Sequence, residues 1–158
     1  MSDLSSEAQP AMEYLLQADP DELFKELGLR FEAIKRNPEL AGSFELPTES
    51  TEEALGLAEL GEGLRDFGHR FFERVNREAY SLVCGKESEQ TQERKKLLDA
   101  FSLGPEAVAA SLAALLVAQL GLAPAISAVV AAIVVKLFFK SAYGAMCEVW
   151  SAKLSPGS

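Results

Sequence analysis

The longest apolar stretch of the chain runs from Ala107 to Val135, and its 29 residues carry no charge. The tetrapeptide Gly121–Pro124 interrupts this stretch near its middle. Gly is typical just past a helix end and Pro is typical of the first helical position, so the interruption predicts that one helix stops and another starts. The pattern therefore predicts an apolar helical hairpin over residues 105–151.

The second arm of this hairpin is predicted to be one helix from Pro124 to about Ser151. Its β-branched cluster, Ile126 to Val135, would also suit a buried strand, but the Ala content, the length and the Pro start favour a helix. Small residues recur at four-residue spacing in both arms, which would let the two backbones pack closely. They are Ala110, Ala114 and Ala118 in the first arm and Pro124, Ala128 and Ala132 in the second.

The residues before the hairpin alternate between charged and apolar positions in the manner of amphipathic helices. Residues 1–10 are polar and are expected to be frayed. Two capping boxes, at residues 19–22 and 50–53, predict helix starts. Apolar residues then recur at three- and four-residue spacing, and a short helix from about Thr91 to Phe101 follows. The recurring positions are Leu23, Phe24, Leu27, Phe31 and Ile34 after the first box, and Leu57, Leu60, Leu64, Phe67, Phe71 and Val75 after the second.

Four glycines stand in the second of these amphipathic segments, at positions 56, 61, 63 and 68. Each weakens a helix by about 1 kcal/mol relative to Ala. Their frequency indicates a close approach to another helix, although late or partial ordering would give the same pattern. Together these features predict an all-α single domain over residues 1–158. We expect a bundle of five or six helices, with the hairpin 105–151 at its centre and residues 11–101 packed around it.

The charged residues are distributed very unevenly along the chain. Residues 1–100 hold 22 of the 24 acidic residues and 12 of the 15 basic ones, a net charge of −10, whereas residues 101–158 have a net charge of +1. The whole chain has a net charge of −9 and a pI near 4.7. Phosphate contacts need a positive patch, so this acidity argues against a nucleic-acid partner and against binding to anionic lipid through bulk electrostatics.

The N-terminus has acidic residues where an export signal needs a basic segment followed by an apolar one. We therefore expect the chain to be cytoplasmic, or to act on a membrane that it reaches from the cytoplasm. Its two cysteines, Cys84 and Cys147, stand 63 residues apart. Because thiols stay reduced in the cytoplasm, we expect both to be free rather than joined in a disulfide.

Candidate catalytic residues are few. His69 is the only histidine, and no metal-ligand spacing surrounds it or Cys84, so we expect a partly exposed histidine on a helix flank. The acidic pairs Asp21–Glu22 and Glu52–Glu53 lie in predicted first turns, where capping explains them. No phosphate-binding glycine motif is present. The sequence therefore predicts no catalytic residue, no cofactor and no metal site.

A cluster of arginines lies on the longest amphipathic segment. Such a cluster can bind an anionic partner, but an acidic residue stands close to each arginine, which favours a solvated face of ion pairs. The arginines are Arg65, Arg70, Arg74 and Arg77, and the acidic residues are Asp66, Glu73 and Glu78.

The first hairpin arm, Ala107–Leu120, is apolar on every side, and such a helix lies either at the centre of a bundle or in lipid. Its 14 residues span about 21 Å, which is less than the ~30 Å hydrocarbon core of a membrane. A central position in the bundle is therefore favoured over a permanent span. A hairpin that is sheltered in solution and released by a trigger needs no permanent span, so conditional insertion stays open.

The organisation of an Ala-, Val- and Leu-rich hairpin enclosed by charged helices resembles the pore-forming toxin domains of the colicin type. Residues 105–150, with Gly121–Pro124 and the pair Lys136 and Lys140, are also similar in texture to the helical circular bacteriocins. Those bacteriocins are cationic, whereas this chain is acidic. Both resemblances cover only the hairpin. They imply a membrane-active function and assign no role to any residue.

We expect a non-catalytic helical module that uses the apolar hairpin to bind a protein partner or a second copy of itself. The reason is that the C-terminal third has more apolar surface than about four short helices can cover. One alternative is a membrane-active effector, in which the aromatic residues near Lys136 and Lys140 lie at the membrane interface. A third hypothesis is an enzyme. The predicted partner- or membrane-contacting residues are Leu116, Leu120, Leu122, Phe138, Phe139 and Trp150.

Overall fold

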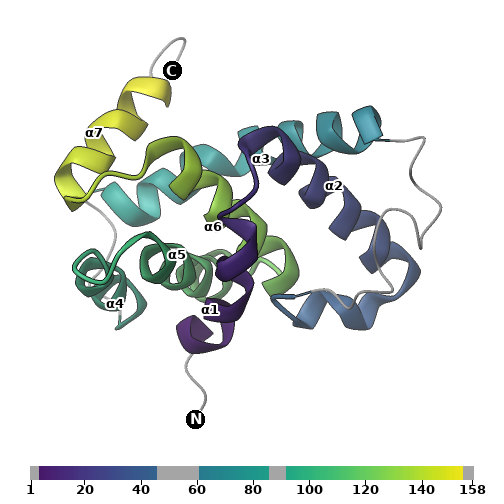
Figure 1. Cartoon of the computed structure of the whole chain (residues 1–158), viewed down its shortest axis with the longest axis horizontal. Coiled ribbons are helices and arrows are strands. Elements are labelled where there is room, and N and C mark those ends of the chain that lie inside the picture. The colour runs from purple at the N-terminus through teal and green to yellow at the C-terminus, as the bar shows by residue number, and fades with distance from the viewer. Residues whose placement is uncertain (1–3, 46–60, 86–91, 155–158) are drawn as a thin grey trace.

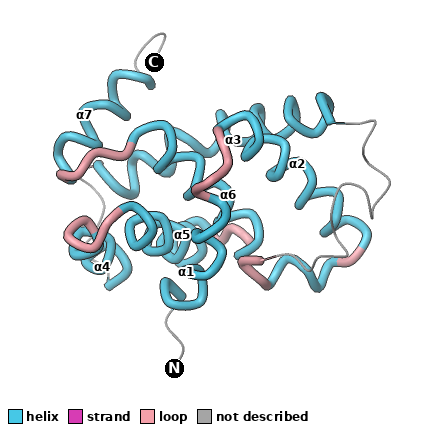
Figure 2. The backbone as a smooth tube through the Cα atoms, viewed as in Figure 1, coloured by secondary structure: helices cyan, strands magenta, loops and turns pink. Residues whose placement is uncertain are grey.

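The computed structural model describes residues 4–45, 61–85 and 92–154 of the chain. These residues form an all-α fold, as the sequence predicts, and no strand occurs among them (Figures 1 and 2). The elements are α1 (Leu4–Leu15), α2 (Pro20–Arg36), the 3₁₀ helix η1 (Pro38–Gly42), α3 (Gly61–Cys84), α4 (Gln92–Ala100), α5 (Pro105–Leu120), α6 (Pro124–Phe138) and α7 (Tyr143–Leu154).

The predicted hairpin is present as α5 and α6. Pro105 and Pro124 occupy the first positions of the two helices. Gly121 ends α5 in the left-handed conformation with φ of 68°, and its N–H donates to the carbonyl groups of Leu116 and Val117. A side chain would strain this conformation, so glycine is the residue that suits it. The interruption in the apolar stretch therefore acts as the predicted turn.

The hairpin lies in the core of the bundle. Every residue from Ala125 to Val135 of α6 is buried, and so is every residue from Val108 to Leu116 of α5. Packed against α6 are α5, α2, α1, η1 and α7, while α5 also contacts α1, α4 and α3. Figure 1 shows α6 crossing the middle of the molecule between the other helices. The charged helices thus remove the uncharged hairpin from water.

The N-terminal residues contribute to this cover. From Leu4 onward they form α1, so the prediction of a frayed segment is wrong for residues 4–10. The physical reason is that Ala8 lies on the same helix face as Ala11, Met12 and Leu15, and all four are buried. This face packs against α5 and α6. Burial of a few small apolar residues is therefore sufficient to order the polar N-terminus.

Two glycines let α2 and α3 come into direct backbone contact. A Cβ atom added at Gly68 of α3 would lie 1.9 Å from the carbonyl oxygen of Phe24, and one added at Gly28 of α2 would lie 2.1 Å from that of Leu64. The close approach predicted for the glycines is therefore confirmed at Gly68. Gly63, by contrast, faces open space. The second capping box, Gly56, Leu57 and Leu60 lie outside the described residues.

The second arm of the hairpin is not one helix. The prediction of a continuous helix from Pro124 to about Ser151 is wrong, because α6 ends at Phe138, α7 begins at Tyr143, and the two are bent by 93°. Residues 139–142 contain no Pro or Gly, so nothing local demands a break. The cause is tertiary packing, since the bend turns α7 onto α3 and buries Trp150 there.

A disulfide joins Cys84, the last residue of α3, to Cys147 in α7. Their Cα atoms are 5.8 Å apart, a separation that a disulfide can bridge. The prediction of two free thiols is therefore wrong. It rested on the expected compartment and on a separation of 63 residues, and neither reveals that the bend after α6 brings α7 against α3.

Among the described helices, none is by itself both long and apolar enough to cross a membrane. The pair α6 and α7 reaches the required length and composition only when the two are taken together across their 93° bend.

Replacing Gly68 with Ala is expected to lower the free energy of unfolding by about 3 kcal/mol, because the new methyl group would force α2 and α3 apart. Urea denaturation followed by far-UV circular dichroism measures this change. The matched control is Gly63→Ala in the same helix, which should raise stability by up to about 1 kcal/mol through helix propensity alone. Equal effects of the two substitutions would show that the helices do not touch at Gly68.

Candidate functional site

The six predicted contact residues divide into buried and partly buried groups. Leu116, Phe138 and Trp150 are buried in the core. In this conformation a partner cannot reach them. Leu120, Leu122 and Phe139 are partly buried and pack against the core from its margin. Leu120 and Leu122 flank the hairpin turn, while Phe139 stands at the opposite end of α6.

Aromatic side chains hold the C-terminal end of α6 against α7 and α3. The rings of Phe138 and Trp150 stack with centroids 5.4 Å apart, and Tyr80 of α3 meets Trp150 edge-on at 5.5 Å. The indole Nε1–H of Trp150 donates to Asn76 Oδ1 at 2.8 Å. A buried indole N–H needs such an acceptor, so Asn76 makes the burial of Trp150 favourable.

Four apolar side chains at the end of α4, in the following turn and at the end of α6 are grouped here as the apolar corner, defined as Leu98, Phe101, Leu103 and Phe139. Leu103, in the turn between α4 and α5, keeps 78% of its surface exposed, and Leu98 at the end of α4 keeps 37%. Phe101 and Phe139 are partly buried and stack with centroids 6.0 Å apart. The corner therefore joins the α4–α5 turn to the residue at which α6 ends.

The rim of the apolar corner carries charges of both signs. Lys95 precedes Leu98 on α4, and Lys140 directly follows Phe139; both are exposed. Asp99 and Glu106 are exposed near the same turn. An apolar centre with a polar rim is the usual arrangement of a protein contact surface.

A second feature, at the other end of α6, is the buried guanidinium of Arg30. Among the described residues it is the one charged side chain that is fully buried. Its Nε donates to Glu26 at 2.9 Å, one terminal nitrogen donates to the carbonyl groups of Phe44 at 2.7 Å and Ala125 at 2.8 Å, and the other donates to the Tyr14 hydroxyl at 3.1 Å. These partners belong to α2, the segment after η1, the start of α6, and α1.

This network makes a buried charge tolerable and binds four segments together. A guanidinium taken out of water is costly unless its donors are satisfied and a negative charge lies close by, as Glu26 does here. Burial raises the pKa of Tyr14 above its usual value of 10.0, although the nearby Arg30 charge acts in the opposite direction. The hydroxyl therefore stays protonated at neutral pH and remains an uncharged acceptor for Arg30.

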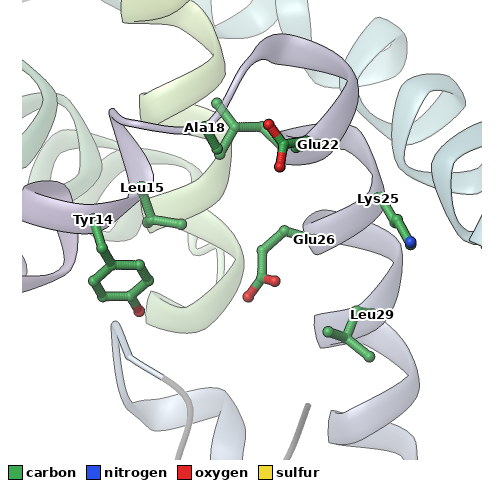
Figure 3. A pocket seen from close by; sticks show the side chains of 8 residues that line it. Tyr14, Leu15, Ala18, Glu22, Lys25, Glu26 and Leu29 are labelled. Carbon is green, nitrogen blue, oxygen red and sulfur yellow. The ribbon is translucent and has the colours of Figure 1, made fainter. Parts of the chain in front are cut away.

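A groove of about 380 Å³ lies beside this network, between α1 and α2. Figure 3 shows Tyr14 and Leu15 on one side and the Glu26 carboxylate directed into the space between the helices. Glu26 already accepts from Arg30, and Glu22 accepts from the backbone N–H of Asp19 in the predicted capping box. Both carboxylates of the groove serve the fold, so we assign it a structural role.

The hydrophobic pattern does not single out Arg30 in advance, but a signal is present. Leu23, Leu27, Arg30 and Ile34 follow one another at four-, three- and four-residue spacing, so Arg30 occupies a position on the apolar face of α2. A charged residue on such a face has two explanations: the predicted apolar face is misplaced, or the charge is buried and has hydrogen-bond partners. The structure shows the second case.

The remaining candidates stay on the surface of α3. His69 is partly exposed, with Nδ1 3.3 Å from a carboxylate oxygen of Glu73, which confirms the expected histidine on a helix flank. Arg65 pairs with Asp66 at 3.0 Å and with Asp21 at 3.8 Å, which confirms the predicted ion pairing at Arg65; for Arg70, Arg74 and Arg77 it stays a prediction. Within the described ranges, no three His, Cys, Asp or Glu side chains are grouped to hold a metal ion.

Comparisons with protein-family models, with curated proteins and with solved structures find no match to the chain. The candidate site is therefore argued from its own residues: the apolar corner and the buried aromatic cluster at one end of α6, and the Arg30 network at the other.

Replacing Arg30 with Met is expected to lower the free energy of unfolding by about 3–5 kcal/mol. The substitution leaves the Glu26 carboxylate and two buried carbonyl groups without their donor. Urea denaturation followed by far-UV circular dichroism measures the effect. Arg65→Met is the matched control, because its ion pairs are exposed and should contribute less than about 1 kcal/mol. A similarly small effect at Arg30 would contradict the proposed network.

Proposed function

We propose that this chain is a non-catalytic helical interaction module that binds a protein partner or a second copy of itself. The observation that supports this proposal most directly is the apolar corner, where Leu103 keeps 78% of its surface exposed. Single apolar residues on a surface are ordinary, but here the exposed Leu98 and the Phe101 ring, which stacks on Phe139, lie within five residues of Leu103 in the chain. Grouped exposed apolar residues with a polar rim are typical of contact sites.

The proposed surface differs in part from the one that the hydrophobic pattern favours. Most of the hairpin is covered by its own chain, so only its margins can take part in a contact. Of the predicted contact residues, Phe139 belongs to the apolar corner. Leu120 and Leu122 lie at the opposite end of α6 and form at most a separate small contact.

The charges around the apolar corner set the orientation of a contact rather than the sign of the partner. Lys95 and Lys140 flank the corner together with Asp99 and Glu106. Opposite charges steer association and fix the orientation of a contact. A second copy of the chain carries the same mixed rim, so self-association is the simplest form of the proposal.

Replacing Leu103 with Ser is expected to weaken self-association about ten- to a hundredfold, which corresponds to the loss of one well-buried leucine side chain. Sedimentation velocity over a range of protein concentrations measures the association constant. Leu137→Ser is the matched control, because Leu137 is an exposed leucine outside the apolar corner. A wild-type chain that stays strictly monomeric at high concentration would exclude the self-associating form of the proposal.

A second function, conditional insertion into membranes, is supported by a different observation. Residues 107–135 carry no charge, and most of them are sheltered in α5 and α6 rather than anchored to water by polar groups of their own. In this proposal the hairpin leaves its cover and enters the bilayer.

The membrane proposal predicts that the chain releases an entrapped dye from liposomes under the condition that opens its cover. Release is followed by fluorescence over a range of pH and in both zwitterionic and anionic vesicles. Because the chain is acidic, release should be weakest on anionic vesicles at neutral pH. No release in any vesicle at any pH would exclude this function.

A further inference from the structure

The bend between α6 and α7 lies where the local sequence permits a continuous helix. Residues 139–142 include no Pro or Gly. The Phe139 N–H still donates to the Val135 carbonyl as in a helix, and the Phe139 backbone, with ψ of 133°, leaves the helical conformation. Where the local sequence permits a second arrangement, tertiary packing can decide between the two.

The contacts that keep α7 in the bent arrangement lead to α3. The contacts between these helices include hydrogen bonds, a covalent bond and the edge-on meeting of the Tyr80 and Trp150 rings. The Tyr143 hydroxyl donates to the Val83 carbonyl, the Trp150 indole donates to Asn76, and the disulfide joins Cys147 to Cys84. Single hydrogen bonds contribute modestly and re-form with water on release. Burial of Trp150 and Met146 also favours the bent arrangement, and the disulfide is the one of these contacts that a single chemical reaction can open.

The position of the disulfide suits chemical control. Both cysteines are partly buried at the margin of the core rather than within it. Cys84 ends α3 and Cys147 lies in the second turn of α7, so the bridge ties α7 down close to the bend. It also closes a loop of 63 residues that includes the whole hairpin. Opening it removes the covalent link between α7 and α3.

We propose that the Cys84–Cys147 disulfide is a thiol-exchange latch. While it is closed, α7 is held across α3. When it is reduced, α6 and α7 join through residues 139–142 into one helix over residues 124–154. Trp150 then leaves Asn76 and Tyr80, and the ring of Phe138 loses its stacking partner. Both rings become exposed next to the apolar corner.

The exchange uses a dithiol as the reductant. A thiolate of the dithiol attacks one sulfur of the bridge, the bond between Cys84 and Cys147 breaks, and a mixed disulfide forms while one cysteine leaves as a thiolate. The second thiol of the reductant then attacks the mixed disulfide and releases the other cysteine. The dithiol becomes a disulfide, and the two cysteines gain its two electrons and its two protons.

This inference deepens the proposed function, because the side chains that the latch exposes adjoin the proposed contact surface. It rests on the proposed function only for its biological consequence. The movement of α7 is measured without any partner or membrane. A failure of the latch is therefore distinguishable from a failure of self-association, which the Leu103→Ser variant tests.

Trp150 is the only tryptophan of the chain, so its fluorescence reports the position of α7 directly. The full chain is compared before and after reduction with dithiothreitol. We expect the emission to shift to longer wavelength and quenching by acrylamide to rise several-fold, because the fully buried indole becomes exposed. Hydrogen exchange should slow at the amides of residues 140–143, which gain helical hydrogen bonds, while far-UV circular dichroism shows that the chain stays folded.

The double variant Cys84→Ser with Cys147→Ser is the matched control. It should show an exposed Trp150 without reductant and no response to dithiothreitol. Two results would overturn the proposal. In the first, Trp150 stays shielded in the reduced chain. In the second, the amides of residues 143–154 lose protection together, which would mean that α7 unfolds instead of joining α6.

Discussion

Burial of the uncharged hairpin is the constraint on which the rest of this structure depends. An apolar stretch of 29 residues cannot stay in water as an isolated pair of helices, and α6 offers no polar face that could remain outside. Each other helix therefore supplies one apolar face toward it and one charged face toward solvent. Even the polar N-terminus is drawn into a helix, because Ala8, Ala11, Met12 and Leu15 cover part of α5 and α6.

The two ends of α6 are closed by different chemistry. At its start, Arg30 donates to the Ala125 carbonyl and at the same time to groups on α1, α2 and the segment after η1. A guanidinium has donors in a fixed fork, so this contact specifies the relative positions of all four segments. A buried charge of this kind adds less to stability than to uniqueness, since an apolar core does not distinguish one register from another.

Much of the fold follows from local signals in the sequence. The capping box at Asp19, the prolines at the helix starts and the left-handed Gly121 are short-range features that act alike in most proteins. The close approach at Gly68 is also visible as a glycine within an amphipathic pattern. The bend after Phe138, the disulfide and the Arg30 network cannot be obtained in this way. Each depends on a residue that is distant in the chain and brought close by the packing of whole helices.

The contacts at the two ends of α6 differ in how they can be opened. This difference makes the C-terminal end the more suitable one for a reversible movement of α7. The Arg30 network has partners on four segments, so no single event can release it without unfolding much of the bundle. At the other end of α6, α7 packs on α3 and on Phe138 and Phe101, and one of these links is a covalent bond that a single reaction can open. A regulated interaction needs apolar surface that one chemical event can expose. Reduction of the disulfide is such an event, and the apolar corner lies close to it in the fold. The Arg30 network fixes the start of α6, while the disulfide fixes α7 beyond its other end. Opening the disulfide can therefore expose apolar side chains at that end while the rest of the bundle stays folded.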